Sequence, residues 1–138
     1  MPDVGFRKWL GLEYEVMEDG HAVVSMDLDE HKYNLRDVAH GGIVASLIDI
    51  AMGTAAAGGN YDTKLRPMVT LELKVNYLAG AVGKRLTATA DVIRAGGRTS
   101  VVRCEVKTDR GEVCAAGLGT FIIRRPHAND PEHFKAAE

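Results

Sequence analysis

Apolar residues recur at helical spacing between residues 43 and 56. At about 100° per residue they fill one broad arc, made of Ile43, Val44, Leu47, Ile48, Ile50, Ala51 and Met52. So wide an arc is typical of a helix that is mostly buried. A His-Gly-Gly turn at residues 40–42 precedes the helix, and a Gly pair at residues 58–59 marks the place where we expect it to end.

The other side of this helix carries Asp49 in a stripe of small residues, namely Gly42, Ala45, Ser46, Gly53 and Ala56. Ionised Asp has weak helix propensity and is costly to bury without partners, so folding alone gives little reason to place it there. Small neighbours allow a ligand or another backbone to approach closely. We therefore expect Asp49 to face a crevice or a second chain. The alternative is a solvated Asp on an exposed helix face.

After the helix, the pattern changes to a period of two. The apolar residues Val69, Leu71, Leu73, Val75 and Tyr77 alternate with the polar residues Thr70, Glu72, Lys74 and Asn76. This alternation predicts a strand with one buried face. Residues 86–93 and 99–107 are predicted to form a hairpin around an Ala-Gly-Gly turn at 95–97, and residues 112–124 the last strand.

The residues before the helix predict a short amphipathic helix at 4–10, a strand at 12–17 closed by a turn at 18–20, and a second strand at 21–28. Consecutive hairpins imply antiparallel pairing. The predicted fold class is therefore α+β, with one long helix packed on a single antiparallel β-sheet.

The chain has 138 residues, which fits one domain; we expect it to span residues 1–125, with residues 126–138 as a polar tail. The net charge of -2 and the pI near 6.2 argue against a protein that binds nucleic acid or a membrane surface through charge. The sequence shows no apolar run near the ~20 residues of a membrane span and no signal-peptide pattern, so we expect a cytoplasmic protein.

The two cysteines flank the predicted turn at residues 109–111. Across that turn Cys104 would lie opposite a residue near Gly117 and not opposite Cys114, so the pair is out of register for a disulfide. Two reduced core thiols are expected, which agrees with a cytoplasmic location.

The helix start and Asp49 together suggest a catalytic site. Backbone amides in the first turn of a helix are unsatisfied donors at its positive end, suited to stabilise a developing oxyanion. Asp49 is the candidate base or nucleophile. Gly41 and Asp49 are separated by roughly 12 Å along one helix, too far to act on the same carbonyl carbon. We therefore expect a two-fold dimer in which antiparallel helices bring Gly41 of one chain to Asp49 of the other.

The spacing of Asn34, the His40-Gly41-Gly42 turn and Asp49 resembles that of the hotdog-fold acyl-CoA thioesterases, in the branch of the phenylacetate-pathway and 4-hydroxybenzoyl-CoA thioesterases. The resemblance covers roughly residues 11–124. It implies a central helix wrapped by an antiparallel sheet, dimers joined sheet edge to sheet edge, and usually homotetramers. It also implies hydrolysis of an acyl-CoA to a free acid and coenzyme A, without a metal or redox cofactor. An aromatic acyl group is the first expectation and a medium-chain aliphatic one the second.

The resemblance also assigns catalytic roles. Asp49 matches the general base or nucleophile, between which the sequence does not choose. Gly41 matches the residue whose amide polarises the thioester carbonyl. His40 matches a residue that positions the thioester; its alternative is a helix-terminal His packed under a loop. Asn34 matches a polar residue that orients the water or the carbonyl, and an Asx turn is its alternative. Thr70 matches a hydroxyl that serves in the Asp-bearing branch, where other members have one at the position of Gly53.

Substrate binding is assigned to a second group of residues, Gly42, Arg94, Gly97, Arg98 and Thr99. The Gly-Arg-Thr segment resembles the hairpin that contacts the coenzyme A nucleotide, where arginines pair with phosphates. The alternative is a charged hairpin tip that binds no ligand.

Other functions fit the pattern less well. A hotdog dehydratase or hydratase would need a catalytic His beside a carboxylate, whereas His40 and Asp49 are nine residues apart on one helix. A non-catalytic acyl-CoA sensor would lack the carboxylate. The five histidines have no metal-ligand spacing, and no Gly-x-Ser-x-Gly elbow is present, so neither a metal site nor a serine hydrolase is expected.

Overall fold

The computed structural model describes residues 4–58, 68–123 and 129. Its helical elements are α1 (Gly5–Leu10), the short 3₁₀ helix η1 (Glu30–Lys32) and α2 (Gly41–Ala56). The strands are β1 (Leu12–Glu18), β2 (His21–Asp27), β3 (Met68–Tyr77), β4 (Arg85–Ala95), β5 (Thr99–Thr108) and β6 (Val113–Ile123). These bounds confirm each predicted element to within a few residues. The predicted tail lies outside the described residues, except residue 129, so the domain boundary at 125 remains a prediction.

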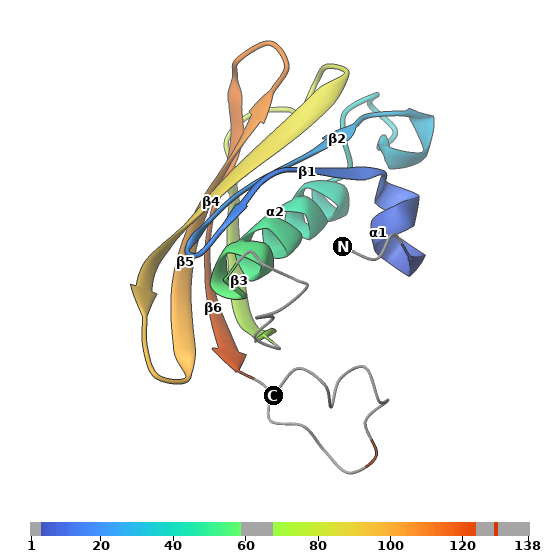
Figure 1. Ribbon diagram of the computed structural model, residues 1–138. Helices are drawn as coiled ribbons and strands as arrows, with labels where there is room; N and C mark the ends of the chain where they lie inside the picture. Colours follow the sequence, from blue (N-terminus) through green and yellow to red (C-terminus); the bar gives the residue numbers. More distant parts are fainter. Residues whose placement is uncertain (1–3, 59–67, 124–128, 130–138) are drawn as a thin grey trace.

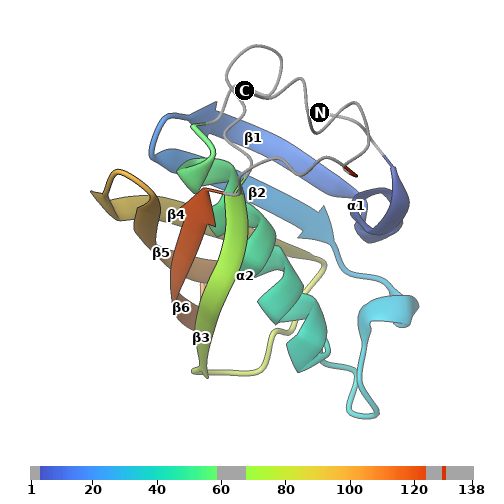
Figure 2. The same ribbon diagram turned by 90° about the horizontal axis from the view of Figure 1, so that it is seen from below.

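The six strands form one antiparallel sheet in the order β1-β2-β4-β5-β6-β3. The sheet curves round α2, which contacts all six strands (Figure 1). Seen from below, β1 and β3 form the two edges, with α2 held between them (Figure 2). This confirms the α+β prediction of a central helix on a single antiparallel sheet. None of the helices in the described ranges is long and apolar enough to cross a membrane.

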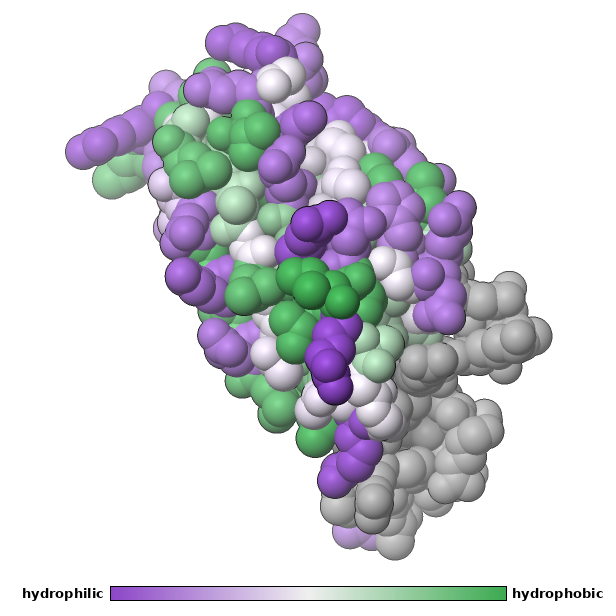
Figure 3. All heavy atoms as spheres, turned by 90° about the vertical axis from the view of Figure 1, so that its left-hand side faces the viewer, coloured by the Kyte–Doolittle hydropathy of each residue, from purple (hydrophilic) through white to green (hydrophobic). Residues whose placement is uncertain are grey.

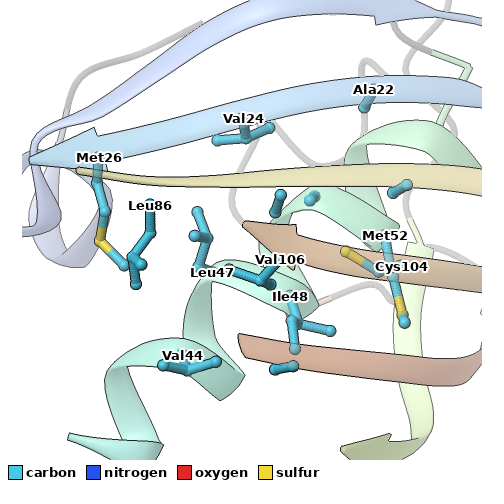
Figure 4. Close-up of a cluster of buried hydrophobic side chains, with 14 of the residues drawn as sticks. Ala22, Val24, Met26, Val44, Leu47, Ile48, Met52, Leu86, Cys104 and Val106 are labelled. Atoms are coloured by element: carbon cyan, nitrogen blue, oxygen red, sulfur yellow. The ribbon is translucent and has the colours of Figure 1, made fainter. Parts of the chain in front are cut away.

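The core lies between α2 and the concave face of the sheet. Leu47, Ile48 and Met52 of the helix are fully buried and meet inward-facing side chains of β2, β4 and β5 (Figure 4). The helix also lies directly on β6, because a Cβ at Gly117 would come within 2.9 Å of Ile48 and 3.0 Å of Met52. Ile50, predicted inside the buried arc, is only half-buried.

The convex face of the sheet is mostly hydrophilic but has a hydrophobic patch near its middle (Figure 3). Leu118 of β6 points to this side and is 44% exposed. Polar side chains on neighbouring strands form hydrogen bonds with one another on this face. For example, Arg85 of β4 donates to Asp27 of β2 at 2.7 Å.

The cysteine prediction is confirmed. Cys104 lies opposite Gly117 in the β5–β6 register, and both thiols are free and buried. Burial raises the pKa of Cys104 to about 12 and also raises the pKa of Cys114. Both groups therefore stay protonated and unreactive at neutral pH.

A β-bulge in β3 overturns part of the predicted alternation. Thr70 pairs with Phe121 and Glu72 with Thr120, so Leu71 is an extra residue without a partner in that ladder. The bulge brings Thr70 to the helix side together with Leu73, while Leu71 is 58% exposed. The prediction that Val69 and Leu71 share the buried face was therefore wrong, since an inserted residue reverses the alternation on one side of it.

Candidate active site

The turn before α2 presents a free backbone donor. His40 is the N-cap of the helix, and its Nδ1 accepts a hydrogen bond from the Gly42 amide at 3.0 Å. Because Nδ1 accepts, the imidazole proton lies on Nε2. The Gly41 N–H has no acceptor within the parts of the chain that the structure describes. The amides of this turn were expected to be free as a group, but only Gly41 is left to bind an oxyanion.

Asn34 holds the loop that leads into this turn. Its Oδ1 accepts from the amides of Arg36 at 2.8 Å and Val38 at 3.3 Å, and its own amide donates to the Val38 carbonyl at 2.7 Å. This geometry is the Asx turn that the sequence analysis gave as the alternative. The residue also lines the pocket beside Gly41, so the structural role and a role toward substrate are compatible.

Tyr77 contacts the same turn and was missed by the sequence analysis. Its hydroxyl donates to the Gly41 carbonyl at 2.7 Å, and a Cβ on Gly41 would lie 3.3 Å from its ring. The alternation of β3 did place Tyr77 on the helix side, but no sequence signal indicated its partner. The contact fixes the first peptide of α2 and favours a residue without a side chain at position 41.

An open pocket of about 330 Å³ begins at Gly41. This volume is at the small end of the range of about 300–1,000 Å³ found for ligand pockets. Its lining is mainly small or apolar and comprises Asn34, Val38, Ala39, Gly41, Val44, Tyr77, Leu78, Ala79, Gly80, Ala81 and Cys114. The free amide therefore lies at the edge of a space that suits an apolar group.

Asp49 lies further along α2 and is held by a hydroxyl. Thr70 Oγ1 donates to its Oδ1 at 2.7 Å, which the bulge in β3 makes possible. The carboxylate is half-buried, as are Ala45, Ser46 and Gly53 beside it. Ala56, which was predicted to belong to the same stripe, is only 3% exposed and belongs to the core. That Asp49 faces a crevice or a second chain stays a prediction. The structure thus brings Asp49 and Thr70 together.

A single chain does not bring the two halves of the candidate site together. Asp49 does not line the pocket at Gly41, and the eight-residue separation along α2 corresponds to roughly 12 Å. The hairpin tip with Arg94, Gly97, Arg98 and Thr99 is more distant. Thr99 pairs with Ile122 at one end of β6, whereas Tyr77 pairs with Ala115 near the other end. The seven residues of β6 between these two pairs correspond to roughly 23 Å, so the hairpin tip and the Gly41 turn of one chain lie far apart.

Across residues 4–58 and 68–123, no three His, Cys, Asp or Glu side chains are grouped so that they could hold a metal ion. The groups available for catalysis in these ranges are a helix-terminal amide, a carboxylate, a hydroxyl and the His40 imidazole.

The chain and its fold are similar to those of known proteins. The chain is 29% identical to the medium/long-chain acyl-CoA thioesterase YigI of Salmonella typhimurium, over 86% of this chain and 84% of that protein. It is 35% identical to a putative esterase of Saccharolobus solfataricus, over 86% and 82% of the two chains. The structure of the Escherichia coli PaaI protein from the phenylacetic acid degradation operon matches with a TM-score of 0.76 and 28% identity, over 86% and 83%.

The sequence also matches the model of a protein family. The model described as the thioesterase superfamily matches residues 37–115, a range that includes the helix start, Asp49 and Thr70. This match covers more than half of the sequence. The chain therefore belongs to the thioesterase superfamily.

Proposed function

We propose that this protein is an acyl-CoA thioesterase, which hydrolyses an acyl-CoA to a free acid and coenzyme A. The observation that carries the proposal is the free Gly41 amide at the positive end of α2, which opens on a pocket lined mainly by small and apolar residues. The activity printed for the Salmonella relative supports it. The thioester oxygen would accept from this amide, which stabilises the negative charge that develops in the transition state.

Asp49 supplies the second group in this mechanism. As a general base it takes a proton from water, whose oxygen adds to the thioester carbon; the carbon–sulfur bond then breaks, and the proton passes to the coenzyme A thiolate. As a nucleophile its carboxylate adds to the thioester carbon, and the carbon–sulfur bond breaks to release the coenzyme A thiolate; water then hydrolyses the resulting anhydride to the free acid and restores the carboxylate. In both routes Thr70 orients the carboxylate. The Nε2 proton of His40 is free to donate to the substrate.

The site needs two chains. Gly41 and Asp49 of one chain are too far apart to act on one carbonyl, so we assign the acting Asp49 to the partner in a two-fold dimer. The edge strand β3 is the proposed contact, because no described strand pairs with its outer edge. A homotetramer built from two such dimers, and contacts of Arg94 and Arg98 with the coenzyme A phosphates, remain predictions.

A medium-chain aliphatic acyl group is the substrate class we favour. The pocket at Gly41 is modest in volume and lined mainly by small and apolar residues, and the Salmonella relative is named as a medium/long-chain acyl-CoA thioesterase. An aromatic acyl group, which the sequence analysis ranked first, finds support in the likeness to the protein of the phenylacetic acid operon. Both classes share the thioester chemistry.

A thiol-release assay tests the proposal. Purified protein is incubated with benzoyl, phenylacetyl, hexanoyl, octanoyl, decanoyl and palmitoyl coenzyme A, and free thiol is measured over time. We expect the highest kcat/KM among the medium-chain esters. Faster turnover of the aromatic esters would reverse the substrate preference. Tight binding without thiol release would reject hydrolysis and favour an acyl-CoA sensor.

Thr70 provides a prediction within this site. Thr70→Val removes the hydroxyl that holds Asp49, and we expect kcat to fall about tenfold with little change in KM, because a hydrogen bond to a charged group is lost. Thr70→Ser keeps the hydroxyl and should stay near the wild-type rate. Equal rates for the Val and Ser variants would show that the hydroxyl has no part in positioning the carboxylate.

A further inference from the structure

We propose that Gly80 sets the length of the acyl chain that this protein accepts. No side chain at position 80 closes the wall of the pocket at Gly41, and the far end of a long acyl chain would leave the pocket through the gap. The inference rests on the proposed function and deepens it, because it assigns one residue to the choice between medium and long chains.

The connection between β3 and β4, residues 78–84, forms one wall of this pocket. Four successive residues of the connection line the pocket, namely Leu78, Ala79, Gly80 and Ala81. The amides of Leu78 and Ala79 donate to the Cys114 carbonyl at 2.9 and 3.3 Å. The Ala81 carbonyl accepts from the Ala39 amide at 3.1 Å, and Figure 2 shows the connection passing the start of α2. These bonds fix the wall relative to β6 and to the helix start.

The fold does not require glycine at position 80. The φ of Gly80 is not in the left-handed region, and a Cβ there would have ordinary contacts, 3.5 Å from Val38 and 3.6 Å from Val82. Gly83 in the same connection is different, because its φ is +141° and a Cβ would collide with the Asp109 carboxylate. A side chain at position 80 would therefore fit between Val38 and Val82. We call the gap that it would fill the outlet.

The outlet joins the pocket to the protein surface. Gly80 lines the pocket and is itself exposed. Leu78 and Val82, which flank it in the connection, are 59% and 38% exposed. Val38, on the other side of the gap, is half-buried and packs against the core. An acyl chain that passes through the outlet would therefore keep contact with apolar side chains.

The volume of the pocket indicates which chains need the outlet. The pocket has about 330 Å³. If a methylene group takes about the 30 Å³ of a water molecule, roughly ten such groups fill this space. Hexanoyl and octanoyl chains are short enough to stay inside, whereas a palmitoyl chain has more carbons than the pocket holds. Only the longer chains should therefore depend on what occupies position 80.

Gly80→Val tests the inference, because its side chain would close the outlet while Gly41 and Asp49 stay unchanged. We expect kcat/KM for palmitoyl coenzyme A to fall at least about 30-fold, since each methylene that loses its apolar contact lowers it by a factor of about four. The value for hexanoyl coenzyme A should stay within about twofold of wild type. Thiol release is measured below the concentration at which palmitoyl coenzyme A forms micelles.

Two further variants complete the series. Gly80→Ala is the matched control, because its Cβ only reaches ordinary contact with Val38, and kcat/KM for both esters should stay within about threefold of wild type. Val82→Phe closes the outlet from the exposed side, at a position that does not line the pocket, and should cause the same selective loss as Gly80→Val. An unchanged ratio of the palmitoyl to the hexanoyl value in the folded Val variant, or in Val82→Phe, would overturn the inference.

Binding of unreactive thioethers separates this inference from the proposed function. S-hexyl- and S-hexadecyl-coenzyme A have no thioester carbonyl, and their Kd values are measured by isothermal titration calorimetry. We expect Gly80→Val to weaken binding of the hexadecyl ligand at least about tenfold and to leave that of the hexyl ligand unchanged. This binding difference in a protein that releases no thiol from any ester would reject the function and leave the role of Gly80 standing. Thiol release by a protein whose folded Gly80→Val variant binds the hexadecyl ligand as wild type does would reject the role of Gly80 alone.

Discussion

Asp49→Ala is expected to lower kcat for acyl-CoA hydrolysis by at least about 100-fold, the scale of loss when a positioned base is removed. Its contacts give little reason for the fold to change, because the carboxylate is half-buried and Thr70 is its hydrogen-bond partner. Ala also has a higher helix propensity than Asp. Asp49→Asn keeps the shape of the side chain and an acceptor for Thr70, and should be as inactive as the Ala variant.

A carboxylate outside the candidate site, that of Asp91, provides the control for the Asp49→Ala substitution. Asp91 is half-buried on β4 and pairs with His21 at 2.7 Å, far from both halves of the site in sequence and register. Asp91→Ala should keep kcat within about twofold of wild type. The measurement is steady-state thiol release, with circular dichroism and size-exclusion chromatography on each variant. Turnover of the folded Asp49→Ala protein at the wild-type rate would reject the role given to this carboxylate.

Gly41→Pro is expected to lower kcat/KM by about 100- to 1,000-fold, the range seen when one oxyanion-hole donor is removed. Proline lacks the N–H that Gly41 offers to the substrate. The backbone tolerates it, since position 41 is the first residue of α2, where proline is favoured. His40, with φ of -57° and ψ of 140°, already has the extended conformation required before a proline.

Gly41→Ala is the matched control. Both substitutions place a Cβ about 3.3 Å from the Tyr77 ring, so both disturb that contact, but only proline removes the donor. We expect the Ala variant to keep most of the activity that the Pro variant loses. Thermal unfolding of the two variants shows whether they fold equally well. Equal activity of the two would mean that the Gly41 amide does not bind the developing oxyanion.

The spacing of apolar residues and the turn residues in the sequence predicted most of the fold. The 3.6-residue period of α2 and the hairpin turns fixed the element order, and the turn at residues 109–111 placed Cys104 opposite Gly117. The error came at Leu71, because an inserted residue leaves no mark in an alternating sequence and yet reverses which side chains face the helix. Ala56 was assigned to the open stripe because a helical wheel does not show where neighbouring strands cover a helix.

The candidate site was predicted only in part. The helix-terminal amide and Asp49 could be recognised because each has an unusual place on one helix. The contact of Thr70 with Asp49 matches the resemblance, although the plain alternation put Thr70 on the other face. Tyr77 was missed because its contact with Gly41 joins positions 36 residues apart, and such a contact depends on how the end of β3 packs against the start of α2.

The shared site is tested most directly by mixed dimers of Asp49→Ala and Gly41→Pro chains. Each chain carries a different affinity tag, and the heterodimer is purified after co-expression. One of its two sites combines an intact Gly41 with an intact Asp49, whereas neither parent dimer has such a site. We expect the heterodimer to hydrolyse acyl-CoA at about half the wild-type rate per dimer, and both parents to be inactive. A folded heterodimer as inactive as its parents would contradict a site built from two chains.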